Sequence, residues 1–192
     1  MSNQSGIYTD LIYASQVAGA AKASFTSEFK LNDTTTMGPT PVLLPEYFMP
    51  ISGVGRGLHI IARGILSSTG TPTYTFTCRA GAEGSTSAAI LLGSAALTTT
   101  SGAASQIWQF EGDVILKTFG AAGANSTLTG VGTLTSSGTA NKIDPLYGAA
   151  ATPGTVATFD HSILNYINFN ITCSASSSSN TITLQQLVVI GF

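Results

Sequence analysis

The chain has 192 residues, of which 43% are hydrophobic and only 8% are charged, and its formal net charge is −2. Soluble domains carry about 25% charged residues, so this surface must be unusually poor in charge. Seven Lys and Arg residues are too few for a patch that neutralises a nucleic-acid backbone, so we expect no nucleic-acid partner. No apolar run is long enough for a transmembrane helix, and the N-terminus lacks the basic region of a signal peptide.

Residues 1–50 differ in composition from the rest of the chain. Residues 11–29 fit either a short Ala-rich helix or an extended arm, and the stretch that follows holds Pro39, Pro41, Pro45 and Pro50. Each proline fixes its own φ and favours extended geometry in the residue before it. We therefore predict an arm or linker over residues 1–50, followed by one domain over residues 51–192.

The segment from residue 57 onward shows the two-residue alternation of β-strands. In residues 73–80, Tyr74, Phe76 and Cys78 share one face, and Trp108, Phe110 and Val114 do so in residues 105–119. The predicted strands cover residues 57–67, 73–80, 88–91, 96–99, 106–119, 126–136, 163–173 and 180–190, with a possible extra strand near 155–159 and a long loop over 137–155.

Eight strands without a convincing helix predict an all-β protein, and Thr- and Ser-rich outer faces favour antiparallel pairing. We predict a single eight-stranded antiparallel jelly-roll sandwich. Between Gly120 and Phe192 the only charges are Lys142, Asp144 and Asp160. Because sheet edges are normally protected by charge, we expect partner subunits to cover this surface, with residues 120–192 supplying much of the interface.

Three segments carry a resemblance to a known family: GRGLHIIARGILSSTGTPTYTFTCRAG (55–81), SQIWQFEGDVILKTFG (105–120) and NTITLQQLVVIGF (180–192). Their order of strands and turns resembles the single jelly-roll structural proteins of tailed bacteriophages, closest to capsid decoration (cement) proteins and related head or tail fibre domains. The resemblance implies a homotrimer that binds the major capsid protein on the outside of the virion, after assembly in the host cytoplasm.

The two cysteines test this fold assignment. In a jelly roll the second and the penultimate strands are neighbours, which places Cys78 and Cys173 on adjacent strands. Both have core parity, so we expect them to lie close together. We also expect both thiols to be reduced, because a phage capsid assembles in a reducing cytoplasm.

Few residues suit catalysis or metal binding. Asp160, His161 and Ser162 are adjacent, and if they are extended, neighbouring side chains point to opposite faces and cannot converge as a catalytic set. His59 has the parity of an exposed or interface residue. Glu111 and Asp113, two apart on a polar strand face, fit a solvated face better than a glycosidase pair. We expect no enzymatic activity, no metal and no cofactor.

The expected function is therefore structural: a decoration protein that stabilises a phage shell by binding its outside. The alternative is a glycan-binding jelly-roll module of a tail or head fibre, with candidate platform residues Tyr47, Phe48, Trp108, Tyr147 and Tyr166, of which Trp108 fits the core better. The candidate capsid contacts are apolar side chains of an arm that cannot bury itself: Leu43, Leu44, Tyr47, Phe48 and Met49. Tyr147, in the predicted long loop, is a further candidate for an exposed contact.

Overall fold

The computed structural model describes residues 10–15, 17–32, 37, 41–51, 54–123, 126–139, 143–148 and 155–192, and this part of the chain is built from antiparallel β-strands. The strands are β1 (Asp10–Ala14), β2 (Lys22–Ala23), β3 (Phe29–Lys30), β4 (Leu43–Leu44), β5 (Pro50–Ile51), β6 (Val54–Gly55), β7 (Gly57–Ser67), β8 (Thr73–Gly81), β9 (Ala89–Ser94), β10 (Leu97–Thr98), β11 (Gln106–Thr118), β12 (Ser126–Ser136), β13 (Ile143–Tyr147), β14 (Thr155–Phe159), β15 (Asn165–Cys173) and β16 (Thr181–Gly191).

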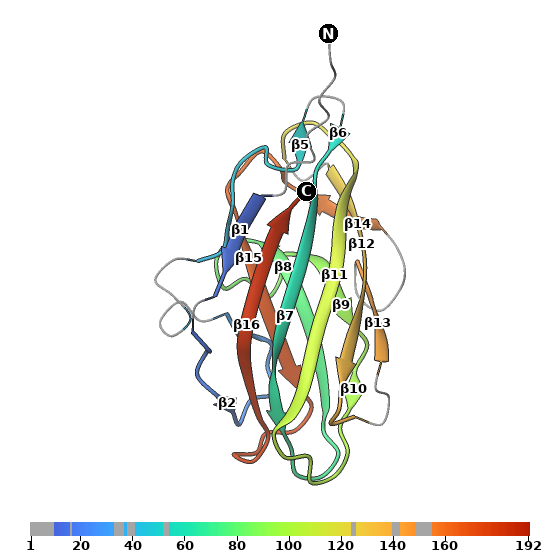
Figure 1. Cartoon of the computed structure of the whole chain (residues 1–192). Coiled ribbons are helices and arrows are strands. Elements are labelled where there is room, and N and C mark those ends of the chain that lie inside the picture. Colours follow the sequence, from blue (N-terminus) through green and yellow to red (C-terminus); the bar gives the residue numbers. More distant parts are fainter. Residues whose placement is uncertain are drawn as a thin grey trace, which may run out of the picture.

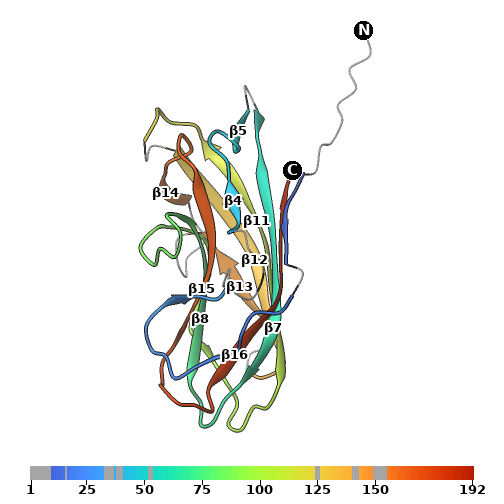
Figure 2. The same ribbon diagram turned by 90° about the vertical axis from the view of Figure 1, so that its left-hand side faces the viewer.

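The strands form an elongated two-layered sandwich (Figures 1 and 2). Hydrogen-bonded neighbours follow the order β1-β16-β7-β11-β12-β13-β9-β8-β15-β3, so one layer passes into the other where β13 pairs with β9. The β5–β6 hairpin and the C-terminus lie at one end of the sandwich, the upper end in Figure 1. The all-β antiparallel prediction is confirmed.

The eight-stranded jelly roll is not confirmed. Strand β7 lies between β16 and β11, and β16 also pairs with β1 and β2, which lie outside the eight predicted strands. Fourteen of the described strands belong to one continuous sheet. The predicted long loop over 137–155 contains β13, which connects the two layers. By contrast, the predicted bounds of residues 57–67 and 126–136 agree with β7 and β12 to the residue.

An aromatic cluster fills the centre of the core. Trp108 on β11 stacks on Phe169 of β15 with ring centroids 5.8 Å apart, Phe110 meets Phe169 edge-on at 4.9 Å, and Phe76 lies 5.0 Å from Trp108. Gly64, the cross-strand partner of Trp108, leaves the space that the indole occupies, since a Cβ there would come within 2.5 Å of the ring. The core parity predicted for Trp108, Phe110, Val114, Tyr74, Phe76 and Cys78 is confirmed.

The described residues between 10 and 51, here called the strap, connect the two layers on the side away from β13. Strands β1 and β2 pair with β16 of one layer, whereas β3 and β4 pair with β15 of the other. Figure 2 shows the blue segment crossing between the layers. The strap places buried apolar side chains in the core: Leu31, Met37, Val42, Leu44 and Met49. The expectation that this segment cannot bury itself is therefore wrong for the described residues. Of the two alternatives for residues 11–29, the described residues follow the extended one, with β1, β2 and the start of β3.

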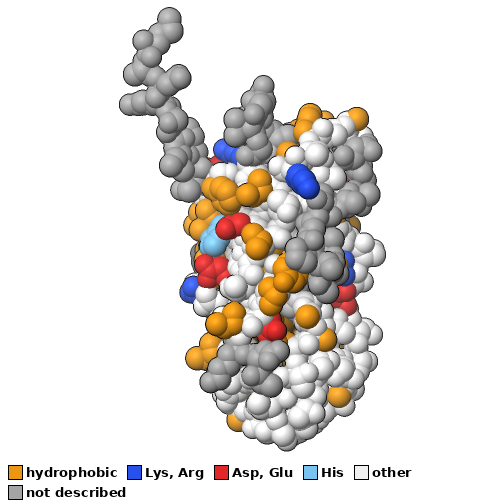
Figure 3. Space-filling model, turned by 90° about the vertical axis from the view of Figure 1, so that its right-hand side faces the viewer, with side chains coloured by type: hydrophobic (Ala, Val, Ile, Leu, Met, Phe, Trp, Pro, Cys, Tyr) orange, Lys and Arg blue, Asp and Glu red, His pale blue; other side chains and the backbone are white. Residues whose placement is uncertain are grey.

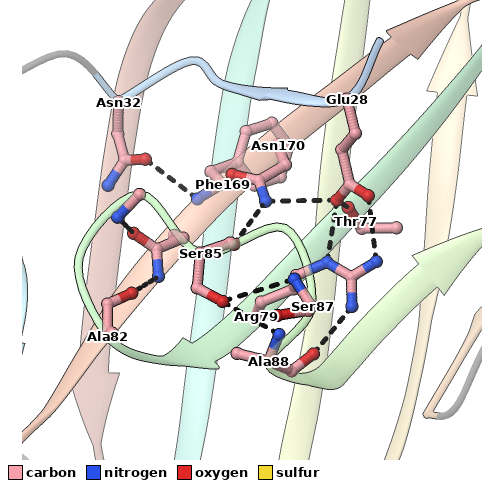
Figure 4. Close-up of polar contacts among 12 residues, drawn as sticks. Glu28, Asn32, Thr77, Arg79, Ala82, Ser85, Ser87, Ala88, Phe169 and Asn170 are labelled. Atoms are coloured by element: carbon pink, nitrogen blue, oxygen red, sulfur yellow. Dashed lines mark hydrogen bonds and ion pairs between the residues drawn. The ribbon is translucent and has the colours of Figure 1, made fainter.

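A polar network fixes the strap to the outside of β8 and β15 (Figure 4). Arg79 binds Glu28 with two hydrogen bonds, Nε to Oε1 at 2.8 Å and Nη2 to Oε2 at 3.0 Å, while Thr77 and Asn170 also donate to Oε1. The side chain of Asn32 pairs with the backbone of β15 as a neighbouring strand would: its Nδ2 donates to the Ile167 carbonyl and its Oδ1 accepts from the Phe169 amide.

The cysteines confirm one part of their prediction and contradict another. Both thiols are free and buried, and β8 and β15 are neighbouring strands. The register, however, pairs Cys78 with Phe169 and Cys173 with Tyr74. Four residues of offset at about 3.4 Å each separate the two cysteines by well over 12 Å, so they are not close together. Burial raises the pKa of the Cys78 thiol to about 12, which keeps it protonated and unreactive.

Candidate functional site

Exposed apolar side chains gather on the outer surface of three neighbouring strands. Ile115 on β11, Val131 on β12 and Ile143 on β13 are exposed, whereas Tyr147 on β13, predicted to be an exposed contact, is half-buried; together we call them the outer apolar face. Val131 and Ile143 are 66% and 68% exposed, and Val131 is the direct cross-strand partner of Tyr147. The intervening outward positions of β12 are threonines rather than charges. Exposed apolar surface rimmed by polar groups is typical of interaction sites.

A polar rim borders the outer apolar face on the side of β7. His59 Nδ1 lies 2.7 Å from Asp113 Oδ1, and His59 Nε2 lies 3.5 Å from Glu111 Oε1. Figure 3 shows hydrophobic side chains distributed over this side of the molecule, with acidic and basic side chains between them. Arg63 continues the rim, donating to Gln109 on β11 and to Gln186 on β16. The two carboxylates therefore flank a histidine on the sheet surface.

A second cluster lies at the end of the sandwich where β11 finishes and β12 and β15 begin. Tyr47 and Phe119 are 53% and 64% exposed, and both rings contact the buried imidazole of His161, at 5.5 Å and 4.6 Å between centroids. His161 Nδ1 is hydrogen-bonded to Ser126 Oγ at 2.7 Å. We call Tyr47, Phe119, His161 and the adjacent Asp160 the aromatic end.

Residues 160–162 form a turn rather than a strand, so the assumption of extended geometry is wrong there. Asp160 Oδ1 accepts hydrogen bonds from Ser162 N at 2.9 Å and Ser162 Oγ at 2.6 Å. These bonds lower the pKa of Asp160, with smaller help from the Gly123 amide and the charge of His161. The imidazole instead binds Ser126, so Asp160, His161 and Ser162 do not form a relay in this arrangement.

The predicted contact residues separate into two groups. Leu44 and Met49 are buried in the protein's own core, and Phe48 is half-buried with the Arg56 guanidinium 4.9 Å above its ring. Their side chains are therefore largely occupied within the chain. Leu43 and Tyr47 are exposed, and their role in partner contacts stays a prediction.

The predicted aromatic platform is not brought together. Trp108 is in the core, as its parity indicated, whereas Tyr147 belongs to the outer apolar face and Tyr47 to the aromatic end. Sequence reasoning missed Phe119 and the Ser126–His161 pair. The only sequence signal for Phe119 is a large apolar residue placed beyond a strand end and before a glycine.

In the part of the chain that the structure describes, no group of residues is a candidate metal site and no helix is a candidate membrane span. No three or more His, Cys, Asp or Glu side chains there are grouped to hold a metal ion. Over the same residues, no helix has the length and apolar character needed to cross a membrane.

Comparison with known proteins does not assign this chain to a family. No family model matches this chain, and no curated protein matches it. Among solved structures, the CBM2 module of the evolved Dit of Lactobacillus casei BL23 phage J-1 matches 77% of this chain and 66% of that chain, just under two thirds of its length. The sequence identity is 11% and the TM-score is 0.30, values too low to carry an argument. The chain's own strands show an antiparallel all-β protein.

Proposed function

We propose that this protein is a non-enzymatic structural component of a phage virion that binds the outside of the capsid shell as a decoration protein. The observation that carries the proposal is the outer apolar face, where Val131 and Ile143 are exposed among threonines. Such a face buries apolar area on docking, and its threonine hydroxyls exchange hydrogen bonds with a partner, while the nearest carboxylate, Asp113 opposite Val131, stays at its border. The resemblance of residues 55–81, 105–120 and 180–192 to phage decoration proteins points the same way.

Shell stabilisation follows from mass action. A ligand that binds the assembled shell but not its dissociated subunits shifts the equilibrium toward assembly. A homotrimer would let three weak contacts act together through effective concentration. In this proposal the partner is the major capsid protein. Because most of the contact residues predicted in the strap are buried or half-buried, the proposed contact surface is instead the outer apolar face, together with the exposed strap residues Leu43 and Tyr47.

The test is binding of the purified protein to particles of its phage that lack it. The double variant Val131→Asp/Ile143→Asp places two charges in the proposed interface and should weaken shell binding at least about tenfold. Leu11→Asp is the matched control, because Leu11 is equally exposed at 66% on β1, across the sheet from β13, and it should bind normally.

Two outcomes contradict the proposal in different ways. If the double variant is folded and binds shells as tightly as the wild type, the outer apolar face is not the contact. If the wild-type protein does not bind shells at all, the decoration function is wrong. Light scattering on the isolated protein tests the trimer separately.

The glycan-binding module remains the second candidate function, because the aromatic end has two exposed rings on a histidine that is adjacent in sequence to the carboxylate of Asp160.

A further inference from the structure

The aromatic end has the features of a binding site held ready before any ligand arrives. Tyr47 and Phe119 come from segments far apart in the chain, yet both rings contact the His161 imidazole. Their exposed fractions of 53% and 64% leave much of each side chain open to solvent. Large aromatic side chains are usually buried because each removes much apolar area from water, so two exposed rings sharing one buried support need an explanation.

The support itself is fixed by hydrogen bonds. His161 is buried, its Nδ1 is bonded to Ser126 Oγ at 2.7 Å, and its carbonyl oxygen accepts from the Tyr47 amide at 2.8 Å. Ser126 Oγ also accepts from the Gly120 amide at 3.1 Å, next to Phe119. One serine and one histidine therefore connect both backbone segments that carry the exposed rings.

The backbone of Tyr47 is held in an unfavourable conformation. Its φ is 55°, in the left-handed region that bulky residues adopt only at a cost. Strain of this kind persists where the surroundings enforce it, and it occurs preferentially at functional sites. Here the Tyr47 amide donates to the His161 carbonyl, and the Tyr47 ring meets the imidazole edge-on.

The acidic residues adjacent in sequence to this site narrow the choice of ligand. Asp160 immediately precedes His161, and its Oδ1 is oriented by Ser162. Glu46 is exposed and immediately precedes Tyr47. Two carboxylates disfavour a phosphate or another anion, but they accept hydrogen bonds from hydroxyl groups. The site thus favours an uncharged ligand with an apolar face and a rim of hydroxyls.

We propose that the aromatic end is a saccharide-binding site, in which Tyr47 and Phe119 stack on the C–H faces of hexopyranose rings and Asp160 accepts hydrogen bonds from ring hydroxyls. The site is separate from the outer apolar face, and of its residues only Tyr47 is also among the shell contacts proposed above, so Phe119 and Asp160 belong to the saccharide site alone. A decoration protein with this site would also hold the particle on a glycan-coated surface.

The experiment uses the full-length protein on an array of neutral hexose oligosaccharides and bacterial wall polysaccharides, with saturation-transfer NMR on the bound compounds. Saturation of the Tyr47 and Phe119 ring protons should pass to sugar C–H protons. Phe119→Ala and Tyr47→Ala should each weaken binding at least about tenfold, whereas Tyr47→Phe should retain most of it because the ring remains. Asp160→Asn should weaken binding less, because an amide oxygen still accepts a hydrogen bond.

The matched control is Val131→Asp/Ile143→Asp, which should bind saccharide normally. This control separates the two proposals, since its loss of shell binding tests the outer apolar face alone. Absence of binding to every compound on the array overturns the saccharide site and leaves the shell proposal intact. Binding that survives both alanine variants also overturns it, because the saccharide then lies elsewhere.

Discussion

Glu28 and Arg79 show how individual charged residues are used in a chain that has few of them. Burial on its own would raise the pKa of Glu28, but hydrogen bonds from Arg79, Thr77 and Asn170 outweigh it and the pKa is lowered. Arg79 also donates to the Ala88 carbonyl at 2.7 Å, which ties the loop after β8 into the same network. The ion pair therefore fixes the strap and this loop on one sheet.

We expect Glu28→Gln to lower the free energy of unfolding at pH 7 by about 2 kcal/mol, since hydrogen bonds to a charged group are lost. The unfolded-state pKa is near 4.5 and the folded value is lower, so the unfolded chain binds more protons in this interval. The stabilisation is complete above about pH 4.5 and disappears as the pH falls through the lowered pKa. Urea unfolding of both proteins over an acid pH series measures this difference.

The control for Glu28 is Glu83→Gln, which breaks the exposed pair between Lys30 and Glu83 at 3.0 Å. Exposed ion pairs contribute about 0–1 kcal/mol, so this variant should unfold almost as the wild type does. A Glu28→Gln variant whose stability keeps the wild-type pH dependence would show that Glu28 is not the titrating group.

At the scale of elements, strands with clear alternation could be predicted from sequence, and strands without it could not. Strand β7 and strand β12 alternate over 11 residues each, enough to define both the bounds and the core face. The strap strands β2, β3 and β4 have only two residues each, too short for any period. Strand β13 contains Pro145, a residue that argues against a strand in sequence reasoning.

The candidate sites were harder to predict for the same physical reason. The outer apolar face depends on the register between β12 and β13, which pairs Val131 with Tyr147. Local sequence patterns do not determine the register of two strands. The Ser126–His161 contact joins residues 35 positions apart. Local patterns indicated only that Trp108 belongs to the core and that the outer faces are rich in threonine.

Leu43 and Leu44 on β4 give a matched test of the strap as an element. Leu44 is 1% exposed and Leu43 is 40% exposed, so the same substitution probes core and surface at adjacent positions. Leu44→Ala should cost about 2–4 kcal/mol through lost burial and a cavity, whereas Leu43→Ala should cost less than about 0.5 kcal/mol. Thermal and denaturant unfolding measure both, and equal effects would mean that β4 does not close the core.

At the scale of the whole molecule, the chain protects its own sheet edges. The β13–β9 pairing joins the layers on one side, and the strap strands cover β16 and β15 on the other. Covering an edge removes the need for charge there. The scarcity of charge in residues 120–192 therefore does not require partner subunits at the edges, and the proposed interface is a sheet face instead.

This closure makes the strap part of the fold, so a variant that begins at Val54 should not form a stable domain. The deletion removes the buried side chains of Leu31, Met37, Val42, Leu44 and Met49. At about 1.5–3 kcal/mol for each buried side chain, the loss is comparable with the entire stability of a typical domain, about 5–15 kcal/mol. The deletion also uncovers the edges of β15 and β16, so we expect aggregation.

Circular dichroism, cooperative thermal unfolding and light scattering test this expectation. Addition of a peptide covering residues 10–51 should restore cooperative unfolding, because the strap pairs with β15 and β16 through ordinary antiparallel ladders that a separate chain can also form. A monomeric truncated protein that unfolds cooperatively at the wild-type temperature would mean that residues 54–192 fold alone. The strap would then be a dispensable arm, free to take the capsid-binding role first expected of it.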